Sequence, residues 1–92
     1  MSFWEVGLSR KARKFVLKNH LSEDNIVSAC VLAALKISGE ANNADIKKLH
    51  PPYENNYRVR VGDMRIVIDK PDFHKLCIEV VDIEWRTSTS YK

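Results

Sequence analysis

The chain has 92 residues, a hydrophobic content of 45% and a formal net charge of +3. This length predicts one domain over residues 1–92 with one hydrophobic core, and it leaves no room for a second domain. The longest apolar-rich stretch, Ile26–Ile37, is too short and too polar to span a bilayer, and the N-terminus shows no secretory signal pattern. We therefore expect a cytoplasmic protein that does not enter the membrane. Its basic charge permits a nucleic acid or an acidic protein as partner.

The two cysteines, Cys30 and Cys77, lie far apart in the sequence, each within an apolar stretch. Free cysteine behaves as a small apolar residue in a protein core. The spacing matches no metal-binding motif, so we expect two reduced core thiols, no metal site and no cofactor.

The first forty residues show the patterns of one strand and two helices. Phe3–Leu8 has the aromatic and β-branched character of a short strand. Ser9 is a candidate N-cap for a helix over Arg10–Asn19, which carries a narrow apolar stripe. A second helix should follow Ser22 and end at Gly39, since apolar residues recur between them at helical spacing. The short link predicts that the two helices form an antiparallel hairpin.

The second half of the chain shows the patterns of strands. Ile46–Leu49 is a candidate short strand, and two alternating runs within Tyr57–Ile68 flank Gly62-Asp63, a two-residue hairpin signal. Leu76–Trp85 is a candidate buried last strand, with a bulge where the alternation slips at Val80–Val81. We predict an α+β fold: an N-terminal strand and a two-helix antiparallel hairpin packed on one face of a mostly antiparallel four- to five-stranded sheet.

The two-residue turn fixes the register of the hairpin and gathers arginines on one of its faces. Arg60 lies opposite Arg65, and Arg58 shares their face, because side chains alternate along a strand. A directly opposed like-charge pair costs stability, so something should offset it. One explanation is a bound anion such as a phosphate, for which arginine presents a rigid fork of donors. The other is an acidic neighbour on the last strand: Glu79, Asp82 or Glu84.

In their order and spacing these elements resemble the RelE/ParE superfamily of toxins from type II toxin–antitoxin pairs. The resemblance covers nearly the whole chain, and its most specific piece is Tyr57–Val67, which follows Leu8–Ala12 and Ile46–Leu49. A RelE-like member of this family implies a ribosome-dependent, metal-independent endoribonuclease that cleaves translated mRNA. In such members the 2′-hydroxyl attacks the adjacent phosphate. The resemblance also implies three partners: the ribosome, mRNA and an inhibitory RelB-like antitoxin.

Carried over by position, the catalytic residues that the resemblance implies are Arg58, Arg60, Arg65, Arg86 and Tyr91. The first-strand basic residues of the family site are lysines, whereas this chain has arginine at both positions, and the spacing from Arg86 to Tyr91 is slightly short. Arginine stays protonated, so it is unsuited to act as a general base but can neutralise a phosphate transition state. The residue that takes the proton is left open, and the candidates are His50, His74 and Glu54.

The first helix and the short strand Ile46–Leu49 carry further basic residues. Under the resemblance, these residues contact the backbone of ribosomal RNA, an interaction that is independent of sequence and sensitive to salt. The alternative is that they keep an exposed surface soluble. The residues are Arg10, Lys11, Arg13, Lys14, Lys18, Lys47 and Lys48.

Two other functions fit the same family. A ParE-like toxin inhibits DNA gyrase through protein–protein contacts, and a degenerate toxin binds its antitoxin without cleaving anything. Fold alone does not separate these functions from the ribonuclease. The arginine cluster favours the ribonuclease, since gyrase inhibition needs no phosphate-cleaving site.

Overall fold

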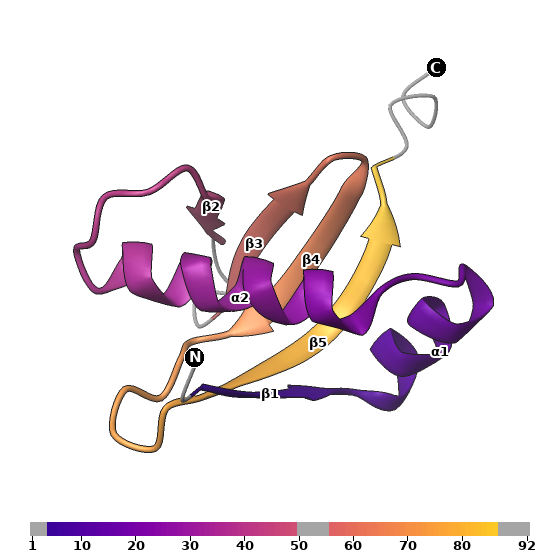
Figure 1. Ribbon diagram of the computed structural model, residues 1–92, viewed down its shortest axis with the longest axis horizontal. Coiled ribbons are helices and arrows are strands. Elements are labelled where there is room, and N and C mark those ends of the chain that lie inside the picture. Colours follow the sequence, from indigo (N-terminus) through magenta and orange to yellow (C-terminus); the bar gives the residue numbers. More distant parts are fainter. Residues whose placement is uncertain (1–3, 50–55, 87–92) are drawn as a thin grey trace.

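The computed structural model describes residues 4–49 and 56–86 (Figure 1). In chain order its elements are β1 (Glu5–Leu8), α1 (Arg10–Lys18), α2 (Glu23–Ile37), β2 (Asp45–Lys48), β3 (Asn56–Val61), β4 (Met64–Asp69) and β5 (Cys77–Trp85). The five strands form one sheet in the order β1-β5-β4-β3-β2. Strand β1 is parallel to β5, and every other pairing is antiparallel. The predicted α+β fold class is confirmed.

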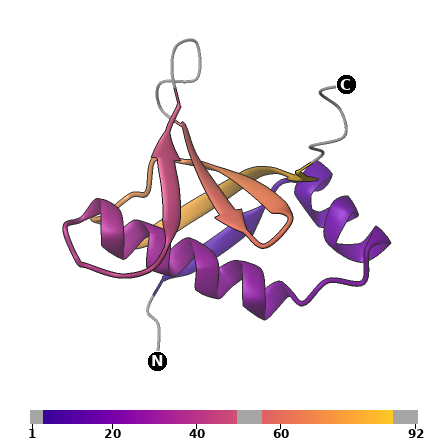
Figure 2. The same cartoon turned by 90° about the horizontal axis from the view of Figure 1, so that it is seen from above.

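The helices lie where the sequence predicts them. The Ser9 hydroxyl accepts a hydrogen bond of 3.0 Å from the Ala12 N–H, and the Ser22 hydroxyl accepts one of 3.3 Å from the Asn25 N–H. Both predicted N-caps are therefore confirmed. Helix α2 crosses one face of the sheet, while α1 packs beside β5 (Figures 1 and 2). None of the helices in the described ranges is long and apolar enough to cross a membrane.

The core lies between the helices and one face of the sheet. Its buried residues are Ala12, Val16, Ile26, Cys30, Ala33, Ala34, Val59, Ile66, Ile68, Ile78, Val80 and Ile83. Burial raises the pKa of the Cys30 thiol to about 12, so this cysteine is a protonated core residue as predicted. The prediction was wrong for Cys77, which is only partly buried. It precedes the core residue Ile78 on β5, so its side chain points to the opposite face of the sheet.

The hairpin of β3 and β4 has the predicted register. Arg60 is paired with Arg65, and Arg58 with Val67. Gly62 has a φ of 56°, a left-handed conformation that glycine adopts without a steric penalty at the first position of a hairpin turn. The two-residue turn on which the arginine cluster depends is thus confirmed.

The predicted bulge on β5 is also present. Val67 of β4 pairs with Asp82 while the next residue, Ile68, pairs with Val80, so Val81 is the extra residue. Val80 is buried, whereas Val81 is 40% exposed. The bulge therefore places Val81 and Asp82 side by side on the face of the sheet that the helices leave uncovered.

Candidate functional site

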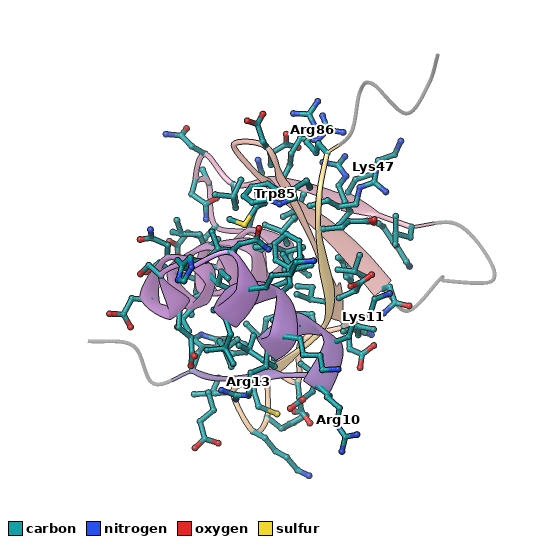
Figure 3. The ribbon with its side chains drawn as sticks, turned by 90° about the vertical axis from the view of Figure 1, so that its right-hand side faces the viewer. Arg10, Lys11, Arg13, Lys47, Trp85 and Arg86 are labelled. Atoms are coloured by element: carbon teal, nitrogen blue, oxygen red, sulfur yellow. The ribbon has the colours of Figure 1, made fainter. Side chains whose placement is uncertain are left out.

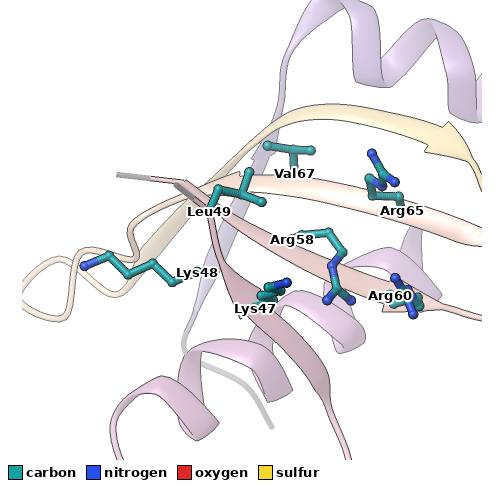
Figure 4. Close-up of a pocket in the computed structure, with 7 residues that line it drawn as sticks. All are labelled: Lys47, Lys48, Leu49, Arg58, Arg60, Arg65 and Val67. Atoms are coloured by element: carbon teal, nitrogen blue, oxygen red, sulfur yellow. The ribbon is translucent and has the colours of Figure 1, made fainter. Parts of the chain in front are cut away.

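The uncovered face of the hairpin carries a depression of about 270 Å³, hereafter the arginine pocket (Figure 4). It is lined by Lys47, Lys48, Leu49, Arg58, Arg60, Arg65 and Val67. The structure thus brings together the three arginines that the hairpin register places on one face. Lys47 joins them because it pairs with Arg58 across β2 and β3, whereas the Lys48 side chain extends away from the arginines (Figure 4).

Arg58 is held by an acidic residue that was not predicted. Its Nη1 lies 3.2 Å from the Asp45 Oδ1, and the Arg58 side chain is only 12% exposed. Asp45 is the first residue of β2 and pairs with Arg60, so its carboxylate reaches diagonally to Arg58. The alternation of the predicted strand Ile46–Leu49, extended by one residue, places Asp45 on the same face as Lys47. That extension is the signal by which Asp45 could have been found.

Arg65 has one of the acidic neighbours predicted from the sequence. Its Nη1 lies 3.5 Å from the Glu84 Oε2 across the β4–β5 pairing. Both side chains are well exposed, at 38% and 51%, so this ion pair adds little to stability and opens easily. Glu84 therefore shields Arg65 without removing it from the reach of an anion.

Arg60 makes no ion pair with any of the described residues. Its cross-strand neighbour is Arg65, which carries the same charge. The Nε atoms of Arg60 and Arg65 are both buried and have no hydrogen-bond partner among the described residues. A buried donor without a partner costs about 1–3 kcal/mol, and a bound anion would recover part of that cost. Acidic neighbours thus balance the charges of Arg58 and Arg65. The unbalanced charge of Arg60 and the two Nε atoms favour a bound anion at this site.

Arg86 lies at the tip of the hairpin, outside the lining of the arginine pocket. Its backbone N–H donates to the Asp63 carbonyl, and its Nη1 lies 3.5 Å from the Gly62 carbonyl oxygen. Figure 3 shows Arg86 and Lys47 toward one end of the view, and Arg10 toward the other. Tyr91 lies outside the described residues, so its predicted role stays a prediction.

The structure does not bring His74 to the arginines. This candidate general base lies in the exposed turn between β4 and β5, where its backbone N–H donates to the Asp72 Oδ1 at 2.9 Å. Hydrogen bonding from the Lys75 backbone, together with that from His74, lowers the pKa of the Asp72 carboxyl. The other two candidates, His50 and Glu54, lie outside the described residues.

Helix α1 forms a second basic surface next to β5. Lys11 Nζ lies 3.3 Å from the Asp82 Oδ2, and Arg13 Nη1 lies 3.8 Å from the Glu23 Oε2. The remaining predicted RNA-binding residues of this helix are exposed and make no ion pair with the described residues: Arg10, Lys14 and Lys18. The predicted basic residues thus lie in two places: on α1, and on β2, where Lys47 and Lys48 line the arginine pocket.

No protein-family model and no curated protein sequence matches the chain. Solved structures do share its fold. A RelB–RelE antitoxin–toxin complex from Methanococcus jannaschii aligns at 25% identity with a TM-score of 0.54, covering 92% of this chain and 95% of that one. A RelE–RelB complex from Pyrococcus horikoshii aligns at 16% identity with a TM-score of 0.57, covering 95% of this chain and 99% of that one. The YoeB dimer from Staphylococcus aureus aligns at 15% identity with a TM-score of 0.61, covering 91% of this chain and 98% of that one. The chain has the RelE-like toxin fold.

Proposed function

We propose that this chain is the toxin of a type II toxin–antitoxin pair and acts in the cytoplasm as a ribosome-dependent endoribonuclease on translated mRNA. The fold shared with RelE and YoeB toxins supports the first part. The observation that carries the second part is the arginine pocket. Three arginines line this one depression, and two of them have buried Nε donors without a partner in the described part of the chain.

In the proposed reaction, the 2′-hydroxyl of a nucleotide attacks the adjacent phosphorus, and the bond to the 5′-oxygen of the next nucleotide breaks. The products are a 2′,3′-cyclic phosphate and a 5′-hydroxyl end. Arg58, Arg60 and Arg65 neutralise the negative charge that builds up on the phosphate oxygens in the transition state. Because arginine keeps its proton, these residues supply charge and positioning rather than base catalysis. Arg86 and Tyr91 keep the catalytic roles that the resemblance implies.

The basic surface of α1 and β2 is proposed to hold the toxin on ribosomal RNA. Lysine and arginine contacts to phosphates release counterions, so this binding should weaken steeply as salt increases. The exposed side chains of Arg10, Lys14 and Lys18 are available for such contacts. Lys11 and Arg13 are available too, because their ion pairs are solvent-exposed and weak.

A RelB-like antitoxin is the proposed inhibitory partner. The RelE structures from Methanococcus jannaschii and Pyrococcus horikoshii were both solved with a RelB chain. An acidic or amphipathic segment that covers the arginine pocket would pair with Arg60 and exclude a phosphate. A complex in which the partner leaves Arg58, Arg60, Arg65 and Arg86 open to solvent would contradict this mode of inhibition.

The test is to induce the chain in cells and map mRNA ends, with double-strand DNA breaks measured in parallel. We expect growth arrest with new cuts in translated mRNA, abolished by Arg60→Ala and by Arg65→Ala. Lys70→Ala is the matched control, since Lys70 is an exposed cation outside the arginine pocket, and it should keep full toxicity. Arrest with DNA breaks and intact mRNA would favour gyrase inhibition instead. Absence of arrest would favour a degenerate toxin.

A further inference from the structure

A second depression, of about 450 Å³, lies beside the arginine pocket on the same face of the sheet; we call it the β5 depression. It is lined by Leu49, Asn56, Arg65, Val67, Val81, Asp82 and Glu84. Three of these residues, Leu49, Arg65 and Val67, also line the arginine pocket, and Figure 4 shows them along one side of it. A ligand whose anion sits in the arginine pocket can therefore extend directly into the β5 depression.

Part of the β5 depression is apolar. Leu49, Val67 and Val81 contribute aliphatic side chains, and Val81 is 40% exposed because the bulge on β5 turns it outward. An exposed aliphatic surface beside an anion site suits a flat, weakly polar group such as a nucleobase. The arginine pocket and the β5 depression therefore offer adjoining surfaces, one for the phosphate and one for the base of a nucleotide.

The polar part of the β5 depression offers the carboxylates of Asp82 and Glu84 as hydrogen-bond acceptors and the Arg65 guanidinium as a donor. Asp82 is held in place by the Ile83 N–H, 2.9 Å from its Oδ1, and by Lys11 near its Oδ2. Glu84 uses one oxygen toward Arg65, and its other oxygen has no partner among the described residues. The Asn56 amide donates to the Ile68 carbonyl and the Asp69 carboxylate, so its hydrogens are occupied. A base bound here must therefore present donors to the carboxylates, and it can turn a carbonyl acceptor toward Arg65.

We propose that the β5 depression binds a guanine base whose nucleotide places its phosphate in the arginine pocket; that the base belongs to mRNA rests on the function proposed above. Guanine presents two adjacent donors, its N1–H and its N2 amino group, which match the two oxygens of a carboxylate. Uracil presents a single imino donor between two carbonyl acceptors, so it forms one hydrogen bond to a carboxylate where guanine forms two, and the carboxylate repels the carbonyl that does not face Arg65. The depression should thus select guanine over uracil.

The test is an NMR titration of the chain with guanosine 3′-monophosphate, uridine 3′-monophosphate and inorganic phosphate. We expect the guanosine nucleotide to bind about fivefold more tightly than the uridine nucleotide, the low end for a bidentate base contact because Glu84 is half exposed. Asp82→Asn and Glu84→Gln keep side-chain size and should each move this ratio toward one. Glu79→Gln, a neutralised acid on β5 outside the depression, is the matched control and should keep the ratio.

The outcomes separate the base site from the anion site. If phosphate binds and Arg60→Ala removes it, yet both nucleotides bind equally in every variant, the guanine inference is wrong and the arginine pocket stands. If phosphate and both nucleotides fail to bind, the arginine pocket is not an anion site and the inference falls with it. In induced cells, mapped cuts should lie beside guanine, and Asp82→Asn should relax that preference; cuts without base preference would contradict the inference.

Discussion

Replacing Arg60 should stabilise the fold, whereas replacing its neighbour Arg58 should destabilise it. Both residues lie on β3 and point to the same face, but only Arg58 has an ion pair among the described residues, with Asp45 at 3.2 Å. Arg60 faces Arg65, and its buried Nε has no partner within residues 4–49 and 56–86. Threonine is the replacement at both positions, because it favours strands and carries no charge. The two substitutions should therefore change the free energy of unfolding in opposite directions, because Arg58 lies beside an acid and Arg60 lies opposite another arginine.

The magnitudes follow from these contacts. Removing an opposed like-charge pair recovers about 0.2–1 kcal/mol, and removing an unpaired buried donor recovers part of about 1–3 kcal/mol. Loss of the packed aliphatic stem of Arg60 offsets some of this gain, which leaves the Arg60→Thr variant about 0.5–1 kcal/mol more stable than the native chain. Arg58→Thr loses an ion pair between a mostly buried arginine and an exposed Asp45, and it should cost about 1 kcal/mol. For a domain of this size, 1 kcal/mol shifts Tm by about 4–8 °C.

The assay is urea unfolding of the native chain and both variants at low ionic strength, where exposed charges are least screened. Inorganic phosphate supplies a second readout, with sodium chloride at matched ionic strength as control. A ligand at about ten times its Kd stabilises the folded state by about 1.4 kcal/mol. We expect phosphate to stabilise the native chain and not the Arg60→Thr variant. Equal destabilisation by both substitutions, or phosphate stabilisation that survives Arg60→Thr, would refute the reasoning.

Four other predictions concern the scaffold. Gly62→Val should cost about 1–2 kcal/mol and lower Tm, since a β-branched residue is strained at the φ of 56° in the hairpin turn; an unchanged Tm would contradict this. Ser9→Ala should cost about 1–2 kcal/mol in urea unfolding, because it removes the N-cap of α1 and the 2.7 Å hydrogen bond to the Val81 carbonyl, whereas Ser28→Ala, an exposed control inside α2, should be nearly neutral. Iodoacetamide at pH 8 should modify Cys77 in the folded chain, and Cys30 only after denaturation, as peptide mass mapping would show. Since the pKa of Cys30 is raised from 9.0 to about 12, the unfolded chain loses this proton first; the free energy of unfolding should fall as pH rises from about 9 toward 12, and Cys30→Ala should reduce that slope.

The sequence by itself determined the local architecture. Both N-caps, the hairpin register and the bulge at Val81 follow from contacts between near neighbours in the chain or from the strict alternation of strands. Because Gly62 and Asp63 form a two-residue turn, the register of the hairpin leaves no choice of face for Arg58, Arg60 and Arg65. This part of the candidate site was predictable from residues only a few positions apart.

Only the tertiary structure decided which charges meet. Asp45 reaches Arg58 because β2 pairs with β3, and Glu84 reaches Arg65 because β5 lies beside β4. The β5 depression likewise needs Leu49 and Asp82, which are far apart in the sequence, on one face. The order of strands in a sheet is set by packing over the whole core, and no periodicity within a single segment encodes it. For that reason the arginines were predictable, and Glu84 was predictable as one of three candidates, but Asp45 and the surface beside the arginines were not.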